Sequence, residues 1–136
     1  MTLLMLEDAR DRIERFDRVL ASASIELVFH RTSHAFIRAY HSLDFVPDLI
    51  ALDHDLFVDD DGDPDPGDGR DVAQFLASRK PKAPILIHST NAIAADSMLY
   101  TLQDAGWTVD RIAPIGDDWI ESYWFPTAME IMRGPR

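Results

Sequence analysis

The chain has 136 residues, of which 46% are hydrophobic, so it suits one compact domain and is too short for two ordinary ones. It contains no cysteine, which excludes disulfides and thiolate metal sites. Its formal net charge of -11 argues against a broad nucleic-acid interface, because such an interface needs clustered Lys and Arg.

The first residues, MTLLMLEDAR, lack the basic start and the longer apolar run of a signal peptide. No segment approaches the roughly 20 apolar residues that span a bilayer. We therefore expect a cytoplasmic protein with no membrane partner. The sequence leaves its oligomeric state open.

Five short apolar runs alternate with helical patterns along the chain, and each run predicts a strand. Helix-capping residues, glycines and prolines set the expected boundaries between them. In chain order we expect a strand at 2–6, a helix at 8–21, a strand at 25–30, a helix from Ser33 to about 43, a strand at 48–53, a helix at about 70–79, a strand at 84–88, a helix that Asn91 caps and Gly106 ends, a strand at 107–113, and a helical region at about 117–134. Pro126 should break or restart that last region, where Ile120, Tyr123, Trp124, Ala128 and Ile131 share one side.

This alternation predicts a parallel sheet with helices on both faces, and right-handed crossovers leave few topologies. We expect one flavodoxin-like, receiver-like α/β/α domain over residues 1–136, with five parallel strands in the order 2-1-3-4-5. Residues 57–69 form an acidic loop, and residues 59–68 alone hold six aspartates. The loop begins like an EF-hand, but its ligand positions do not fit, so a solvated, flexible loop is expected.

Polar side chains directly follow three of the predicted strands, at the sheet edge where such folds bind ligands. Taken singly, Asp8 or Asn91 could be a helix cap, and either histidine could be a buried residue with a satisfied partner. Their joint occurrence favours one functional site. The residues are Glu7, Asp8 and Arg10 after the first strand, Asp53, His54 and Asp55 after the third, and His88, Ser89, Thr90 and Asn91 after the fourth.

Clustered carboxylates repel one another, and a divalent cation would remove that penalty. Oxygen ligands suit Mg²⁺, Mn²⁺ or Ca²⁺, and Mg²⁺ commonly combines one or two carboxylates with a substrate phosphate. We predict Mg²⁺ or Mn²⁺ at Asp8 and Asp53, with Glu7 bound directly or through water. Asp55 is expected to support His54.

Residues 3–115 resemble the receiver fold of two-component signalling. Receivers carry an acidic pair after strand 1, a phosphoacceptor Asp after strand 3, a Ser or Thr after strand 4 and a Lys after strand 5. Here Glu7 with Asp8, Asp53, and Ser89 or Thr90 match the first three positions. Residues 113–116 (APIG) offer no Lys. That Lys neutralises the acyl phosphate in receivers, so its loss weighs against phosphotransfer signalling.

A more specific resemblance is to the cyclic-phosphate processing receiver domain family. Its pattern is an acidic-acidic-x-Arg segment, LDHDL, Gly-x-Asp-Val and HS-x-N. The chain has EDAR at 7–10, LDHDL at 52–56, GRDV at 69–72 and HSTN at 88–91. It departs from the family at Ala94 and Ala95, where members often carry a glycine.

The resemblance implies a metal-dependent phosphoesterase that acts on a small cyclic-phosphate ligand, either a cyclic nucleotide or an RNA end. His54 and His88 would divide the acid and base roles, since imidazoles titrate near neutral pH. The phosphate would contact Arg10, Ser89, Thr90 and Asn91. Two alternatives stay open: an atypical receiver that is phosphorylated at Asp53 or acts as an interaction module, and a non-catalytic domain that binds a phosphorylated ligand.

Overall fold

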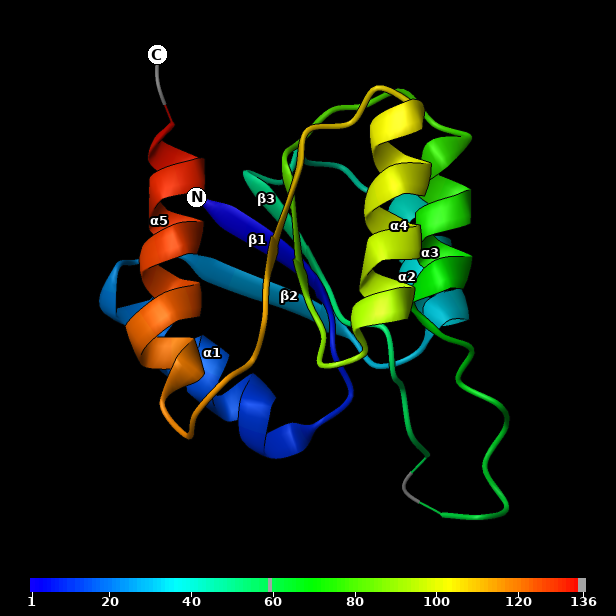
Figure 1. Ribbon diagram of the computed structural model, residues 1–136, viewed down its shortest axis with the longest axis horizontal. Helices are drawn as coiled ribbons and strands as arrows, with labels where there is room; N and C mark the ends of the chain where they lie inside the picture. The colour runs from blue at the N-terminus through cyan, green and yellow to red at the C-terminus, as the bar shows by residue number, and fades with distance from the viewer. Residues whose placement is uncertain (59, 135–136) are drawn as a thin grey trace.

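A five-stranded parallel sheet lies between two layers of helices in the computed structural model, which describes residues 1–58 and 60–134 (Figure 1). The strand order is β2-β1-β3-β4-β5, which confirms the predicted topology. The elements are β1 (Thr2–Leu6), α1 (Arg10–Ser22), β2 (Glu26–His30), α2 (Ser33–His41), β3 (Leu49–Leu52), α3 (Gly69–Ala77), β4 (Ile85–His88), α4 (Ala92–Asp104), β5 (Val109–Ile112), the π-helical turn η1 (Ile120–Trp124) and α5 (Phe125–Arg133).

Side chains of the central strands alternate between the two faces of the sheet, because successive residues of a strand point in opposite directions. In β1, Leu3 and Met5 pack in the core that α1, η1 and α5 cover. Leu4 and Leu6 pack in the core beneath α2, α3 and α4. The residues of β1, β3 and β4 are buried and apolar except for the first residue of β1 and His88 at the end of β4, as expected for parallel strands that are covered on both sides. The sheet is thus a rigid base for the residues that follow its strands.

The starts of α1 and β5 differ from the predicted ones, because a side chain near each start forms a hydrogen bond elsewhere in the domain. Helix α1 begins at Arg10 and not at residue 8, since the Asp8 carboxylate accepts a hydrogen bond from the Phe57 amide (2.8 Å) and does not cap the helix. Strand β5 starts two residues later than expected, because Trp107 turns inward and its indole N–H donates to the Leu76 carbonyl. Asn91 caps α4 as predicted.

The C-terminal helical region is continuous through Pro126. That proline lies in the first turn of α5, directly after η1, so the chain changes from π-helical to α-helical geometry beside it and does not break. Trp124 and Ala128 are buried as predicted, but Tyr123 is 56% exposed and does not face the core. A π-helical turn contains more residues than an α-helical turn, so each residue of η1 rotates less about the helix axis, which explains why a plain helical period misplaces Tyr123.

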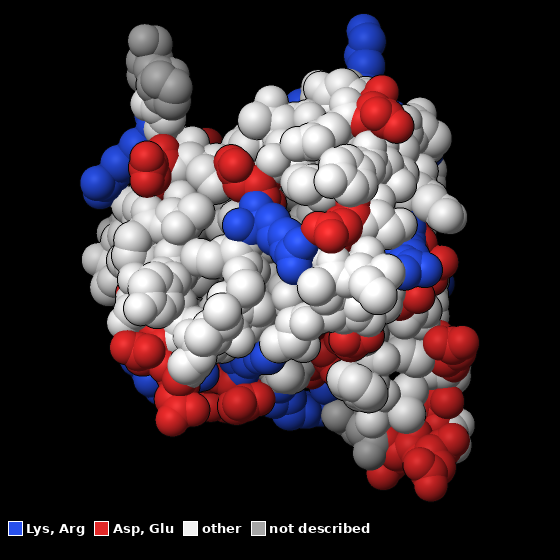
Figure 2. All heavy atoms as spheres, in the orientation of Figure 1, with Lys and Arg blue, Asp and Glu red and all other residues white. Residues whose placement is uncertain are grey.

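The acidic loop leaves the sheet edge between β3 and α3 and projects from the domain (Figure 1). It is tied to the body where the Ser33 amide donates to the Pro66 carbonyl (2.8 Å). Several of its aspartates have local partners: Asp68 caps α3 in a reciprocal box with Asp71, and the Asp63 carboxylate accepts from the Asp60 amide. Asp59, one of the six predicted loop aspartates, lies outside the described residues. Acidic side chains gather on this projection and along the neighbouring lower edge (Figure 2).

Among the described residues, none of the helices has the length and apolar content that crossing a bilayer would need.

Candidate functional site

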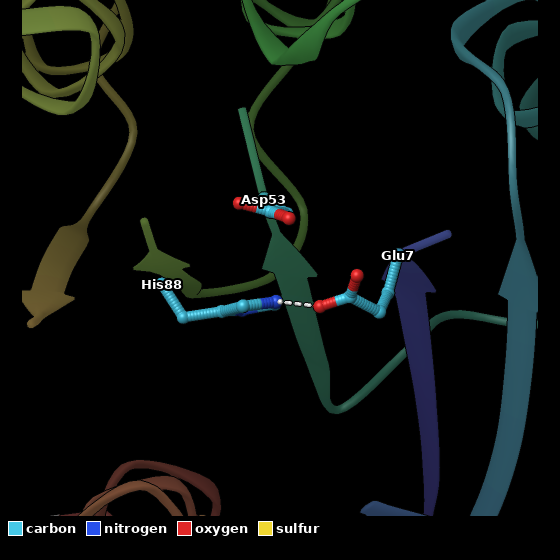
Figure 3. Close-up of side chains that lie close together, drawn as sticks. All are labelled: Glu7, Asp53 and His88. Atoms are coloured by element: carbon cyan, nitrogen blue, oxygen red, sulfur yellow. Dashed lines mark hydrogen bonds and ion pairs between the residues drawn. The ribbon is translucent and has the colours of Figure 1, made fainter. Parts of the chain in front are cut away.

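Glu7, Asp53 and His88 meet where β1, β3 and β4 end (Figure 3). They continue the two-residue alternation of their strands and fall on the side that α1 and η1 cover. One ligand atom of each lies within 4.8 Å of the other two. Glu7 and His88 are 0% exposed and Asp53 is 4% exposed. Burial of two acids and an imidazole is costly unless each group has a partner.

His88 is the partner of Glu7. Its Nε2 lies 3.1 Å from Glu7 Oε1, and because an ionised carboxylate can only accept, this nitrogen carries the proton. The imidazole is packed between Phe16 and Trp119, with ring centroids 5.2 and 5.9 Å away. The second oxygen of Glu7 accepts from the amide of Asp8 (2.9 Å). His88 therefore fixes Glu7 from beneath the sheet edge.

Arg12 reaches the same cluster from the first turns of α1, and the sequence analysis missed it. Its Nη1 lies 3.6 Å from Glu7 Oε1 and 3.7 Å from Asp53 Oδ2. The guanidinium also stacks 5.2 Å from the Trp119 ring. Side chains on a helix lean toward its N-terminus, which here is the sheet edge. That lean, with the position of Arg12 directly before the buried Ile13, was the available signal.

The two buried carboxyl groups of this cluster, Glu7 and Asp53, have pKa values that are shifted in opposite directions. Burial raises the pKa of Glu7, but the hydrogen bond and charge of His88, the Ala9 amide and Arg12 outweigh it and lower the pKa to about 2. Burial raises the pKa of Asp53 to about 7, and the charge of Glu7 adds to this rise against the opposing effects of His88, the His54 amide and Arg12.

The pKa of Asp8 is raised as well. Burial raises its pKa, the Phe57 amide opposes the rise, and the charge of Glu7 adds to it. The cluster therefore carries negative charge that Arg12 does not balance. Hard oxygen donors with unbalanced charge fit a divalent cation such as Mg²⁺ or Mn²⁺.

His54 lies on the other side of the sheet. Its Nδ1 is 2.9 Å from Asp55 Oδ1, and its Nε2 is 3.6 Å from Asp68 Oδ2 at the start of α3. The expectation that His54 and His88 share one cleft and divide the acid and base roles is therefore not met by the geometry. The register explains the separation: Leu52 pairs with Ile87, so the next residue, Asp53, stands beside His88, and His54 is one step out of phase.

A pocket of about 320 Å³ opens above the cluster. It brings together four of the predicted residues, which come from the ends of β1, β3 and β4. Its lining consists of Asp8, Ala9, Arg12, Asp53, Asp55, Phe57 and Thr90. Glu7 and His88 lie beneath this surface. The pocket thus presents carboxylates together with one guanidinium and one hydroxyl group.

The other predicted phosphate contacts lie outside the pocket lining. Ser89 is buried, and its Oγ accepts from the Asn91 amide (3.1 Å). The Asn91 side chain accepts from the Ala94 amide as the cap of α4. Arg10 is exposed at the first residue of α1. The roles of Arg10, Ser89 and Asn91 in phosphate binding stay predictions.

Gly69 explains why the motif at 69–72 begins with glycine. Its amide donates to the His54 carbonyl (2.8 Å), and a Cβ there would lie 2.2 Å from the Asp53 carbonyl oxygen. We expect Gly69→Ala to lower the free energy of unfolding by about 1–3 kcal/mol, since backbone must move. Gly62→Ala is the control, because nothing lies within 4 Å of its added methyl group. Urea denaturation of both variants measures the difference in stability. Equal stability of the two variants would contradict the close approach of residue 69 to the Asp53 carbonyl.

The chain matches a known protein family over most of its sequence. The family model of the Cyclic-phosphate processing Receiver domain matches residues 2–104. None of the curated protein sequences that were compared matches the chain.

Solved structures of receivers share the fold at low identity. The HemR receiver domain of Leptospira biflexa is 20% identical, with a TM-score of 0.67 over 99% of this chain and 96% of that one. The receiver domain of the sensor histidine kinase PA1611 of Pseudomonas aeruginosa, which has a magnesium ion coordinated in its active site cleft, is 15% identical, with a TM-score of 0.68 over 98% of both chains. TrrA of Thermotoga maritima, in complex with Mg²⁺ and BeF, is 14% identical, with a TM-score of 0.69 over 96% of this chain and 97% of that one. With the fold of a receiver and a family match over most of its length, the chain belongs to the cyclic-phosphate processing receiver domain family.

Proposed function

We propose that this domain is a phosphoesterase that depends on a divalent metal and acts on a cyclic phosphate. The observation that carries the proposal is the pocket, where Asp8, Asp53 and Asp55 stand beside Arg12 and Thr90. A phosphodiester anion is repelled by three carboxylates unless a cation lies between them. The same cation would bind the phosphate and relieve the crowding of the acids.

Asp8 and Asp53 are the residues that would hold the ion, because both line the pocket. Glu7 supports them from below, fixed by His88. When bound, Mg²⁺ or Mn²⁺ polarises a phosphoryl oxygen or lowers the pKa of water. The magnesium ion in the receiver of PA1611 supports this choice of metal.

The proton transfer falls to Asp55 and His54. Water adds to phosphorus, one ring P–O bond breaks, and the proton of the water ends on the leaving alkoxide oxygen. Asp55 lines the pocket and can accept that proton, while His54 holds its carboxylate through the 2.9 Å contact. Arg12 and Thr90 are placed to hold the phosphoryl oxygens.

Hydrolysis of cyclic phosphates is the direct test. We expect the wild type with Mg²⁺ or Mn²⁺ to convert at least one member of a panel of 2′,3′- and 3′,5′-cyclic phosphates into a monoester, followed by phosphorus NMR. Asp55→Asn should lower the rate roughly 10²–10⁴-fold, the usual contribution of a general acid or base. Asp44→Asn, at an exposed position between α2 and β3, is the matched control and should keep full activity. No turnover across the panel would overturn the proposal.

Phosphorylation of Asp53 is the second candidate. Asp53 and Thr90 line the same pocket, and Arg12 brings a cation to Asp53 although no Lys follows β5. Incubation with acetyl phosphate and Mg²⁺, followed by intact mass spectrometry, would then show one added phosphoryl group that Asp53→Asn loses. A stable adduct without hydrolysis of any cyclic phosphate would favour the signalling role.

A further inference from the structure

We propose that a second pocket beside the acidic one holds the base of a nucleoside cyclic phosphate whose phosphate lies at the acidic site. The inference rests on the proposed function and adds the place where the base of the ligand would bind. The second pocket has a volume of about 220 Å³ and is bounded by the start of α2 and by the acidic loop. The residues that matter in its lining are Arg31, His34, Phe57, Val58, Asp63 and Pro64.

The two pockets share a wall. Phe57 lines both, and its amide donates to the Asp8 carboxylate (2.8 Å). Arg31 lines the second pocket, and its Nε and Nη2 donate to the Asp8 carbonyl at 3.0 and 2.8 Å. A ligand whose phosphate lies against Asp8 in the first pocket can therefore extend over Phe57 into the second.

The lining of the second pocket suits a flat heterocycle. The Phe57 side chain is 71% exposed, and Val58 beside it is 38% exposed, so the domain itself gains little from their apolar surface. An exposed aromatic face is a platform on which a nucleobase stacks. The Asp63 carboxylate, of which one oxygen accepts from the Asp60 amide, offers a further acceptor to the edge of such a ring.

The charge of the surroundings favours a small nucleotide over a polyphosphate or a long RNA. The acidic loop borders this pocket, and the whole chain carries a net charge of -11. Repulsion grows with each added phosphate, whereas a cyclic phosphodiester carries a single negative charge. A free cyclic nucleotide and a short RNA end share this chemistry, and the experiment must separate them.

The test is the affinity for two ligands that differ only in the base. We expect wild type with Mg²⁺ to bind a nucleoside cyclic phosphate roughly 5- to 150-fold more tightly than the abasic ribose cyclic phosphate, the usual contribution of one stacked base. Calorimetry is done within a time over which phosphorus NMR shows no turnover. A trinucleotide with a cyclic phosphate end then tells a free nucleotide from an RNA end, and preference for either source supports the inference.

Substitutions of Phe57 test whether the preference for a ligand with a base arises in the second pocket. Phe57→Ala should bring the ratio of the two affinities close to one, while Phe57→Trp should keep it, because indole also stacks. Tyr100→Ala, which removes another exposed aromatic (62%) on α4, should leave the ratio unchanged. Equal binding of both ligands by the wild type overturns the base pocket and leaves the proposed function standing. Binding of neither ligand overturns both.

Discussion

Asp53→Asn should stabilise the metal-free protein above pH 7 and remove most of its affinity for Mg²⁺. The pKa of Asp53 is raised to about 7 from its ordinary 3.8, so the folded protein holds this proton more tightly than the unfolded chain does. Stability is therefore lost as pH rises between these two values. Asparagine carries no proton to lose, so Asp53→Asn removes this pH-dependent loss of stability, which is on the order of 2–4 kcal/mol for a buried group with this rise in pKa.

The experiment is urea denaturation in EDTA at pH 5 and pH 8. Wild type should be less stable at the higher pH, whereas Asp53→Asn should change little between the two. The pKa of Glu7 is lowered to about 2, so this carboxyl stays ionised at both pH values. Its contribution to the stability of the fold is lost only as pH falls below its ordinary pKa of 4.5. Calorimetry should show a loss of Mg²⁺ affinity of more than about 100-fold, because even outer partners of a metal site are worth 10–100-fold. Unchanged affinity would remove Asp53 from the metal site.

His88→Ala should lower the free energy of unfolding by about 3–5 kcal/mol, the usual cost of leaving a buried charge without its partner. It leaves the fully buried Glu7 carboxylate without its 3.1 Å partner and opens a cavity between Phe16 and Trp119. A histidine that served only in proton transfer would show the opposite pattern, with lost turnover and unchanged stability.

A double-mutant cycle with Glu7→Gln separates these roles. When Glu7 is neutral, its burial no longer needs His88, so His88→Ala should cost about 0.5–3 kcal/mol less in the Glu7→Gln background. His88→Gln, which keeps a donor near Glu7, is the conservative control and should recover part of the stability. Additive costs in the cycle would show that His88 does not stabilise Glu7.

The strand order could be predicted from the sequence because five apolar runs alternate with helical patterns, and right-handed crossovers then leave few topologies. The run at 48–53 is also almost continuously apolar, as expected for a parallel strand that is covered on both faces. Since parallel strands end at the same edge, the sequence also indicated that Asp8, Asp53, Asp55 and Thr90 would meet, and all four line the pocket.

The side of the sheet that each residue takes could not be predicted. It depends on the register of β3 against β4, in which a shift by one residue would exchange the places of Asp53 and His54. Arg12 was missed for a related reason: its reach to Asp53 depends on where α1 begins, and Asp8 leaves that helix for the Phe57 amide. Both depend on long-range contacts: local patterns indicate that a side chain lies at the sheet edge but not which partner it meets there.

The attachment of the acidic loop has a consequence for how this fold can diversify. The segment is fastened at one end by the Phe57 amide on Asp8 and at the other by the Ser33 amide on the Pro66 carbonyl. Between these fasteners, lengthening a loop costs little, about 0.6 kcal/mol for each doubling of its length. Insertions near the turn at Asp60 and Asp63 would therefore reshape the outer wall of the site while the strand ends keep their places. The segment is a natural position for grafting new recognition elements onto an unchanged scaffold.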